Sequence, residues 1–496
     1  MSATAFPTSA MGLPASLKYD LPPSMSDSAR AYSVNVAPDG QSTVTGPAFN
    51  TAATPAFVAN SSGVFGNYTS QNISFTIPSG MSDSVFLDPI ATTLSFTLTY
   101  TGTGASSTTG GSMNLIGSGA SWFDALTLYS NNTPIETINQ YGLLQNFLLQ
   151  NTVNLAERYG GIGVAMGADS NSATGIELGT GVASYRYNFC IPLLSVIGVN
   201  SDKMFPVGAV NNLQLVMTTA NITPISSYCT AVATQPVFGT GFNLSEFQLN
   251  MKYVDVGDLA AQQLRQTLQE GKWYMKSQTY TNSSVTLPSG SSGSQQLLLQ
   301  IRNTSVKSII HQFGQAQTTT GAPTCPNGYF DAVNPALTSR QCQVAGQFYP
   351  NRPINDLQRP AEGYTYLIQS LGGGIAKSLG TVVNREMYNS VAGVAAVPAG
   401  SDTYCVLPAS GLRAAPAGGD GGSVVVIKYP NSAYYGYDLE KVSSILFSGI
   451  NTRASPPFVN CFLAASTNAS LICQAWGISD VVLVFDAMSK QVTAFI

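Results

Sequence analysis

Only 9% of the 496 residues are charged, against about 25% in an average soluble protein. The 21 basic and 25 acidic residues give a formal net charge of −4 and are scattered without runs. This excludes the dense cationic stripe that duplex binding by counterion release requires, so no direct contact with nucleic acid is expected. Such low charge suits a subunit packed against copies of itself better than a free monomer, and the length allows two or three domains.

The cysteine and histidine content argues against a metal centre. The chain has seven cysteines and one histidine, and no two cysteines form a CxxC pair, so we expect no metal ligands and no cofactor. Cys325 and Cys342 bracket a loop containing Pro326 and Gly328, and a disulfide between them is the lesser alternative to two free thiols in a reducing cytosol. The cysteines are Cys190, Cys229, Cys325, Cys342, Cys405, Cys461 and Cys473.

No segment predicts secretion or membrane insertion. The first residues lack a basic patch followed by an apolar run, and no later stretch reaches the roughly 18 unbroken apolar residues of a spanning helix. We therefore expect a soluble protein made inside a cell.

Along the chain, residues 1–65 contain Pro, Ser, Ala, Thr and Gly with weak periodicity, which predicts an extended arm or an irregular segment. From there on, apolar residues alternate with small polar ones, as in half-buried strands, and clusters of Gly, Asn, Ser and Pro separate them. The predicted strands are Ile73–Ile77, Thr93–Tyr100, Ala125–Tyr129, Tyr185–Ile191, Asn212–Met217, Phe247–Val254, Val285–Leu287, Gln295–Ile301 and Ser308–Phe313.

Two segments break this rhythm towards helix. In Leu143–Leu155 the apolar residues recur at helical spacing, which predicts a short covering helix. In Asp258–Gln269, Asp258 is a suitable N-cap, and Ala260, Leu264 and Leu268 fall on one face. Gly257 and Gly271 bracket this second helix, so it is predicted to connect two domains.

The two halves of the chain echo each other. Asn132–Ile138 and Asn351–Leu357 share the pattern N-x-P-I-x-x-[I/L], and a leucine-rich or aromatic stretch follows each copy, GLLQNFLLQ in one and GYTYLIQSL in the other. The distance along the chain from the first copy to the second is too long for solenoid repeats of about 20–50 residues, and it favours two tandem β-sandwiches. Long loops between the strands are typical of jelly rolls, sandwiches of about eight strands that occur in capsids and lectins.

The chain resembles the double jelly-roll major capsid proteins of virophages, polinton-like viruses and related tailless icosahedral DNA viruses. The resemblance runs from about Ile73 to the C-terminus. The segments that carry it are Phe123–Tyr141, Phe205–Met217, Leu249–Val256 and Tyr434–Pro457.

This resemblance implies an all-β fold of two tandem eight-stranded jelly-roll β-sandwiches with a short connecting helix and long loops. We expect an arm at 1–65, a first jelly roll at 66–256, a helical connector at 257–272 and a second jelly roll at 273–496. The implied function is that of a structural subunit, not an enzyme, which forms pseudo-hexameric homotrimers in the virion shell and assembles inside the host cell. The implied partners are neighbouring capsomers and minor capsid and penton proteins, and an internal membrane is left open.

The residues that could take part in catalysis or phosphate binding are interpreted more simply as structural residues. The single histidine, His311, is read as a strand residue with a local partner and not as a general base. Asp438 and Glu440 can project from one strand face as in some jelly-roll glycosidases, but that spacing is common by chance. The glycine clusters 372–374 and 418–422 lack the Lys and Ser/Thr of a phosphate loop and are read as turns.

We therefore predict no catalytic, cofactor or metal residues. The alternative function from another class is a jelly-roll carbohydrate-binding, lectin-like protein or a glycosidase.

Overall fold

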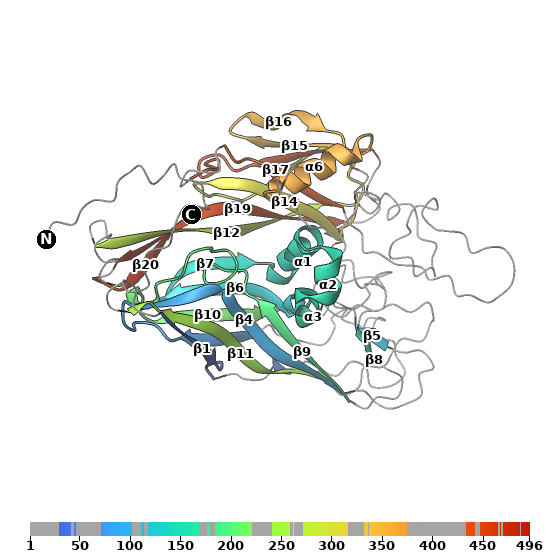
Figure 1. The fold of residues 1–496 in the computed structure, drawn as a ribbon. Helices are drawn as coiled ribbons and strands as arrows, with labels where there is room; N and C mark the ends of the chain where they lie inside the picture. Colours follow the sequence, from blue (N-terminus) through green and yellow to red (C-terminus); the bar gives the residue numbers. More distant parts are fainter. Residues whose placement is uncertain are drawn as a thin grey trace, which may run out of the picture.

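Antiparallel strands make up most of the computed structural model, and they form four large sheets arranged as two sandwiches (Figure 1). Helices are few and lie on one side of the molecule. The structure describes residues 29–40, 44–45, 71–101, 111–113, 118–167, 176–178, 184–220, 241–257, 261, 271–315, 332–335, 337–373, 388, 433–441, 447–464, 467, 470–486 and 488–496.

The first sandwich is built from residues of the first half of the chain. One sheet has the order β1-β11-β4-β9, with β2 (Val44–Thr45) beside β11, and the facing sheet has the order β3-β10-β6-β7. The eight main strands are β1 (Arg30–Val36), β3 (Asn72–Ile77), β4 (Val85–Thr101), β6 (Phe123–Ser130), β7 (Thr133–Asn139), β9 (Ser184–Pro192), β10 (Leu213–Thr219) and β11 (Gly241–Asp255).

The second sandwich repeats this plan. Its sheets have the orders β12-β19-β14-β17 and β13-β18-β15-β16, and β20 (Gln491–Phe495) pairs with β19 in addition. The eight main strands are β12 (Lys272–Leu287), β13 (Gly293–Leu298), β14 (Val306–Gln315), β15 (Leu337–Val344), β16 (Gln347–Ile354), β17 (Tyr434–Asp438), β18 (Phe458–Leu463) and β19 (Leu471–Asp486).

Both sandwiches have the same topology. When the eight main strands of each half are ranked in chain order, both halves give one sheet of order 1-8-3-6 and one of order 2-7-4-5. This confirms the predicted fold of two tandem jelly rolls, and every strand predicted from the sequence overlaps an observed strand.

The shared sequence motif falls on equivalent strands. The first copy lies along β7 and the second ends just after β16, each the fifth-ranked strand of its half. Ile135 and Ile354, the isoleucines of the two copies, are both buried. Each motif leads into a helix, α1 (Tyr141–Thr152) after β7 and α6 (Pro360–Ser370) after β16. The repeat therefore reflects a duplicated strand and helix.

Some elements differ from expectation. Arg30–Val36 lies within the predicted arm at 1–65 yet forms β1, which pairs with β11 along its whole length. Most of its side chains are exposed, so its alternation of Tyr32, Val34 and Val36 is too weak to stand out from the sequence alone. Gly257 and Ala261 are helical, while the rest of the predicted connector at 258–270 lies outside the described residues.

The helical region after β7 is longer than predicted. Beyond α1, two short helices follow, α2 (Leu155–Gly160) and α3 (Ile162–Met166). Asn154 caps α2 in a capping box with Glu157, which explains why a new helix starts there. Two 3-10 turns, Gly119–Trp122 and Val207–Ala209, and a small pair of strands, β5 (Gly111–Met113) and β8 (Ile176–Leu178), complete the described elements.

Two glycines allow close packing around α6. A Cβ at Gly436 of β17 would collide with Ser370 Oγ of α6, and one at Gly363 of α6 would collide with the Asp356 carboxylate, in the segment between β16 and α6. This gives the glycines of the GYTYLIQSL and YYGYD segments a structural reason, since residues without a side chain let the helix approach β17 and Asp356 this closely.

Two apolar clusters fill the molecule. The smaller lies inside the second sandwich. The larger begins inside the first sandwich but continues without a break to Tyr434, Trp476, Ile478 and Phe485 of the second half. The outer surface of the β12-β19-β14-β17 sheet is thus part of a core that both halves share.

Equivalent core positions should have similar energetic weight. We expect Ile135→Ala and Ile354→Ala each to lower the free energy of unfolding by about 2–5 kcal/mol, because each removes a fully buried side chain from a packed core. Leu357→Ala, at a position that is 49% exposed, serves as control and should cost less than about 1 kcal/mol. Denaturant unfolding measures all three, and a negligible effect at either isoleucine would contradict the shared topology.

Candidate functional site: the contact between the two sandwiches

The two sandwiches meet along an edge of one and a face of the other. On the first sandwich the contact includes β7 and helix α1, and on the second it includes β12, β19 and β20 (Figure 1). Backbone groups take part too, since Asn211 N donates to Lys490 O in the turn before β20. The chain therefore joins its halves through structured elements.

A buried carboxylate lies at the centre of this contact. Glu136 on β7 is 2% exposed. Its Oε2 accepts hydrogen bonds from Ser195 Oγ at 2.5 Å and Val196 N at 2.9 Å, and its Oε1 accepts one from Thr279 Oγ1 of β12 at 2.8 Å. Glu136 thus ties its own half to the second half. In the sequence, Glu136 is distinguished only as the single acidic residue in the first copy of the repeated motif.

Burial raises the pKa of Glu136 to about 6, because the hydrogen bonds that favour its charged form compensate only part of the lost hydration. Nearby Tyr141 and Tyr280 are also fully buried, and Tyr141 Oη accepts a hydrogen bond from Leu194 N at 2.9 Å. The carboxylate therefore sits in an environment of hydroxyl and amide donors and apolar side chains.

Aromatic rings form the apolar part of the contact. Phe147 on α1 packs edge-on against Tyr434 of β17 at 4.9 Å between ring centroids, and tilted against Trp476 of β19 at 6.1 Å. Trp476 Nε1 also donates to Asn139 O at 3.4 Å, and Phe205 meets Phe485 edge-on at 5.1 Å. Such pairs add about 0.5–1.5 kcal/mol each beyond area burial.

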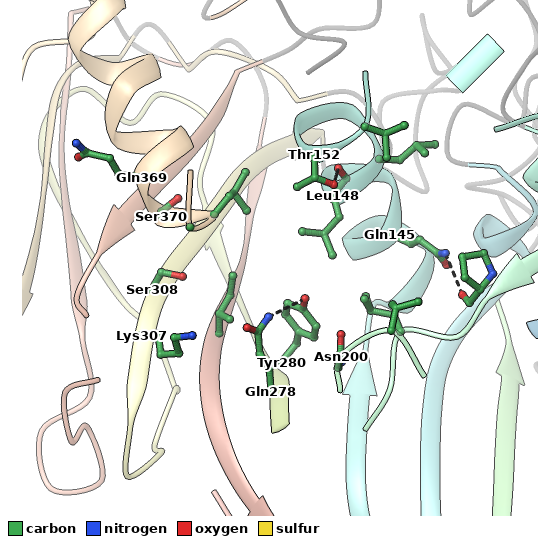
Figure 2. Close-up of a pocket in the computed structure, with 18 of the residues that line it drawn as sticks. Gln145, Leu148, Thr152, Asn200, Gln278, Tyr280, Lys307, Ser308, Gln369 and Ser370 are labelled. Atoms are coloured by element: carbon green, nitrogen blue, oxygen red, sulfur yellow. Dashed lines mark hydrogen bonds between the residues drawn. The ribbon is translucent and has the colours of Figure 1, made fainter. Parts of the chain in front are cut away.

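A pocket of about 400 Å³ opens beside this contact, between α1 and α6 (Figure 2). Leu148, Val153 and Ile478 provide apolar walls, and Gln145, Gln278 and Tyr280 provide polar ones. Within the pocket Gln145 Nε2 donates to Pro192 O at 3.3 Å, and Gln278 Nε2 donates to Tyr280 Oη at 3.0 Å. Two other polar atoms of lining residues, Gln145 Oε1 and Asn200 Nδ2, are buried without a hydrogen-bond partner.

The paired acids Asp438 and Glu440 both line this pocket. Asp438 Oδ1 accepts a hydrogen bond from Glu440 N at 3.0 Å, which holds the turn after β17, and burial raises the pKa of Asp438. Glu440 forms an ion pair with Lys307 of β14 at 3.7 Å. Both carboxylates therefore have structural partners.

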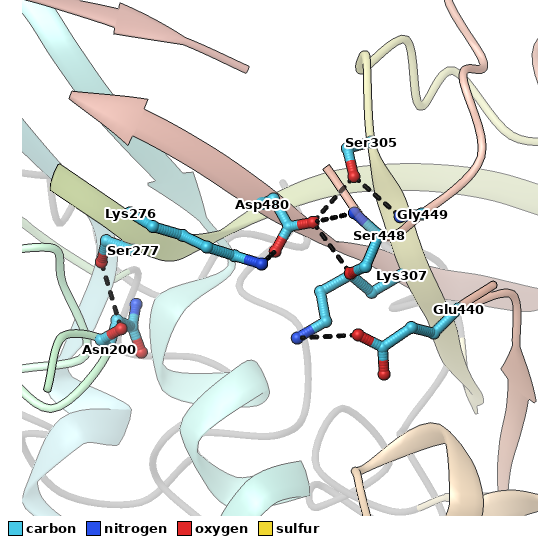
Figure 3. A network of polar contacts seen from close by, with 9 residues as sticks. All are labelled: Asn200, Lys276, Ser277, Ser305, Lys307, Glu440, Ser448, Gly449 and Asp480. Atoms are coloured by element: carbon cyan, nitrogen blue, oxygen red, sulfur yellow. Dashed lines mark hydrogen bonds and ion pairs between the residues drawn. The ribbon is translucent and has the colours of Figure 1, made fainter. Parts of the chain in front are cut away.

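A second buried acid connects strands within the second sandwich (Figure 3). Asp480 on β19 is 1% exposed, and its Oδ1 lies 3.2 Å from Lys276 Nζ. Its Oδ2 accepts from Ser305 Oγ at 2.8 Å, Ser448 N at 2.9 Å and Ser448 Oγ at 3.0 Å. This network fixes the loops before β14 and before β18, and the second of these loops lies within the segment Tyr434–Pro457 that carries part of the family resemblance.

The core of the second sandwich holds a buried ion pair. Arg340 on β15 is fully buried, and its Nε donates to Asp356 Oδ2 at 2.8 Å. Its guanidinium also lies over the rings of Tyr435 and Tyr437, at 5.0 and 4.9 Å. Asp356 belongs to the second copy of the repeated motif, whereas the first copy has Thr137 at that place, so the pair is specific to the second half.

His311 lies on β14 in the same core and, as the sequence suggested, is a strand residue with local partners. It is fully buried, stacks on Tyr437 at 5.6 Å, and its Nδ1 lies 3.8 Å from Cys473 Sγ. Burial and the positive charge of Arg340 hold the pKa of His311 well below its usual range. A neutral histidine packed among aromatic rings has no exposed nucleophile to activate.

The other sequence candidates are placed only in part. Cys342 is a buried free thiol whose pKa burial raises to about 12, while Cys325 lies outside the described residues. Gly372 has φ +80° and ends the α6 segment, as a turn glycine does. Gly374 and the cluster at 418–422 lie outside the described residues, as does most of each long loop.

The described residues form neither a metal-binding cluster nor a membrane-spanning helix. Among the residues that the structure describes, no three His, Cys, Asp or Glu side chains cluster as a metal site would require. In the same part of the chain, no helix has the length and hydropathy needed to cross a bilayer.

Known structures share this fold across nearly the whole chain. A chain of the PBCV-1 virus capsid matches with a TM-score of 0.54 at 11% identity, over 97% of this chain and 99% of that one. A chain of the Sputnik virophage matches with a TM-score of 0.55 at 11% identity, over 100% and 93%. The Faustovirus major capsid protein matches with a TM-score of 0.54 at 9% identity, over 96% and 93%.

No protein-family model matches the chain, and no curated protein matches it. The structural likeness is therefore one of fold. The chain has the double jelly-roll fold found in viral major capsid proteins, as the sequence resemblance predicted.

Glu136 should make the stability of the fold depend on pH. Its folded pKa of about 6 lies above its usual 4.5, so the folded state binds the proton more tightly. The stabilisation is full below about pH 4.5 and is lost as the pH rises to about 6, a difference of about 2 kcal/mol. Glu136→Gln should abolish this component, as measured by denaturant unfolding from pH 4 to pH 7. An identical pH slope in variant and wild type would contradict the assignment.

The Asp480 network should stabilise the second sandwich. We expect Asp480→Asn to lower the free energy of unfolding by about 2–3 kcal/mol, because an amide nitrogen would replace an oxygen that accepts hydrogen bonds or pairs with Lys276. Glu440→Gln breaks a partly exposed ion pair and should cost less than about 1 kcal/mol. Equal losses in thermal or denaturant unfolding would contradict this ranking.

Proposed function

We propose that this chain is the major capsid protein of a tailless icosahedral DNA virus, and that its role is structural. The observation that supports the proposal most strongly is the fold itself. Two sandwiches of identical topology are joined by a shared core, and the known structures that match over nearly the whole chain include the PBCV-1 virus capsid and the Faustovirus major capsid protein.

In this proposal three copies form a pseudo-hexameric capsomer, with six sandwiches around its axis. The unit that each copy contributes is the pair of jelly rolls at 66–256 and 273–496, with the connector at 257–272 between them and the arm at 1–65. The shared apolar cluster supports this reading, because it makes the two sandwiches one block and not two tethered domains. The low charge content also suits a subunit with large contact surfaces.

The proposed location is the virion shell, which assembles inside the host cell. The proposed partners are neighbouring capsomers and minor capsid and penton proteins, without direct contact to nucleic acid. The proposed role does not include catalysis. A lectin-like or glycosidase function has less support, because the matched structures share both sandwiches and not one alone.

The oligomeric state tests the proposal. Three copies of the 52.0 kDa chain have a mass of 3 × 52.0 = 156 kDa, and light scattering after size-exclusion chromatography should show this species as the smallest stable one. Negative-stain electron microscopy should show particles with a hexagonal outline. A protein that stays monomeric at high concentration would contradict the proposed function.

A further inference from the structure

The pocket between α1 and α6 has two chemically different walls (Figure 2). The wall from the first half of the chain is mostly apolar. The wall from the second half is mostly polar and carries every charged side chain that lines the pocket. The apolar residues of the first wall include Leu148, Leu149, Val153, Ile162, Met166 and Val199. The pocket is therefore amphipathic, and a molecule inside it touches both halves.

The size of the pocket suits a small molecule. Its volume of about 400 Å³ lies within the range of roughly 300–1,000 Å³ that is typical of ligand-binding pockets. Since a water molecule takes up about 30 Å³, the pocket has room for about a dozen non-hydrogen atoms. A lysine side chain from a partner, with its four-carbon stem and ammonium group, would leave more than half of that space unfilled.

One carboxylate in the polar wall lacks a counter-ion. Lys307 is ion-paired with Glu440 at 3.7 Å, and the described residues place no cation in ion-pair contact with Asp438. The hydrogen bond from Glu440 N is accepted by Oδ1 of Asp438, which leaves Oδ2 for a further donor. Asp438 is exposed, so a molecule in the pocket can reach its carboxylate. The three charged side chains of the wall together carry a charge of about −1 at neutral pH.

The surroundings of Asp438 favour a cationic ligand over an anionic one. Burial raises the pKa of Asp438, the hydrogen bond from Glu440 N lowers it, and the Glu440 carboxylate raises it by more than Lys307 lowers it. A cation beside Asp438 would offset this excess of negative charge, whereas an anion would add to it. The unpartnered Gln145 Oε1 and Asn200 Nδ2 are an acceptor and a donor, so together they do not select a charge.

We propose that this pocket binds a small aliphatic amine, with a primary ammonium group at one end of an apolar chain. The ammonium donates hydrogen bonds to the Asp438 carboxylate, and the chain lies against the apolar wall of α1 and α3, as the stem of a lysine lies along apolar surface. A free amine is assigned in preference to a lysine of another copy, because a longer chain fills more of the pocket. The site lies within one chain and does not depend on the proposed function.

Four probes that differ in chain length or head group test the ligand class on the full-length protein. Octylammonium should bind at least about tenfold more tightly than butylammonium, because each further methylene group is buried against the apolar wall. It should bind about three- to fivefold more tightly than 1-octanol, a modest factor since Asp438 is exposed. Octanoate should bind most weakly of the three octyl probes. Isothermal titration calorimetry at pH 7 measures all four dissociation constants.

Three variants test the location of the site. Asp438→Asn keeps an oxygen for the hydrogen bond from Glu440 N but removes the charge, so octylammonium should lose its advantage over 1-octanol while 1-octanol binding stays unchanged. Ile162→Trp places a bulkier side chain at the 44% exposed Ile162 of the pocket wall and should weaken both probes at least about tenfold. Val164→Trp is the matched control, because Val164 is 45% exposed on the same helix but does not line the pocket.

Several outcomes would overturn the proposal. If none of the four probes binds, the pocket holds only water. Equal binding of octylammonium and 1-octanol to the wild type, or an unchanged preference in Asp438→Asn, would show that the carboxylate does not select the ligand. Binding of butylammonium as tight as that of octylammonium would point to a lysine side chain of a partner. Equal effects of Ile162→Trp and Val164→Trp would place the bound amine elsewhere.

Discussion

The burial of one sandwich flank against the other is the constraint on which the rest of the structure depends. A jelly roll normally presents the outer faces of its sheets to water, yet β19 is buried on both faces over most of its length. Its inner side fills the second core, and its outer side, with Trp476 and Ile478, belongs to the core shared with the first half. Separating the sandwiches would expose this apolar surface and leave Glu136 without its partner Thr279.

The two halves share one topology, but equivalent residues of the two halves differ in how deeply they are buried. Ile138 and Leu357 end the two copies of the repeated motif, and the first is fully buried while the second is 49% exposed. In the first half, β7 contacts the second sandwich, whereas among the residues that the structure describes no further sandwich covers β16. The two equivalent edge strands therefore differ, because β7 is joined to the other sandwich of the chain and β16 is not.

The alternation of apolar and polar residues predicted strands in most of the first sandwich and at the start of the second, but it did not single out β7, β15, β16 or β17. The repeated N-x-P-I pattern was enough to predict a duplicated sandwich. Edge strand β1 was missed because a strand with one covered side and few buried residues has little hydrophobic pattern. The junction was not predictable, because Glu136, Thr279 and Trp476 meet only after folding and are far apart in the sequence. In the sequence, α6 could be recognised only because it follows the second motif copy as α1 follows the first. Its short aromatic stretch is equally typical of a strand.

The central claim is that this chain contributes two fused sandwiches to a larger ring. Electron cryomicroscopy of the purified oligomer tests it most directly, because it shows both the subunit and its neighbours. The account predicts six sandwiches around a threefold axis, with Phe147 and Trp476 in contact inside every chain. A map in which the halves of one chain lie apart, or in which copies fail to form a closed ring, would contradict it.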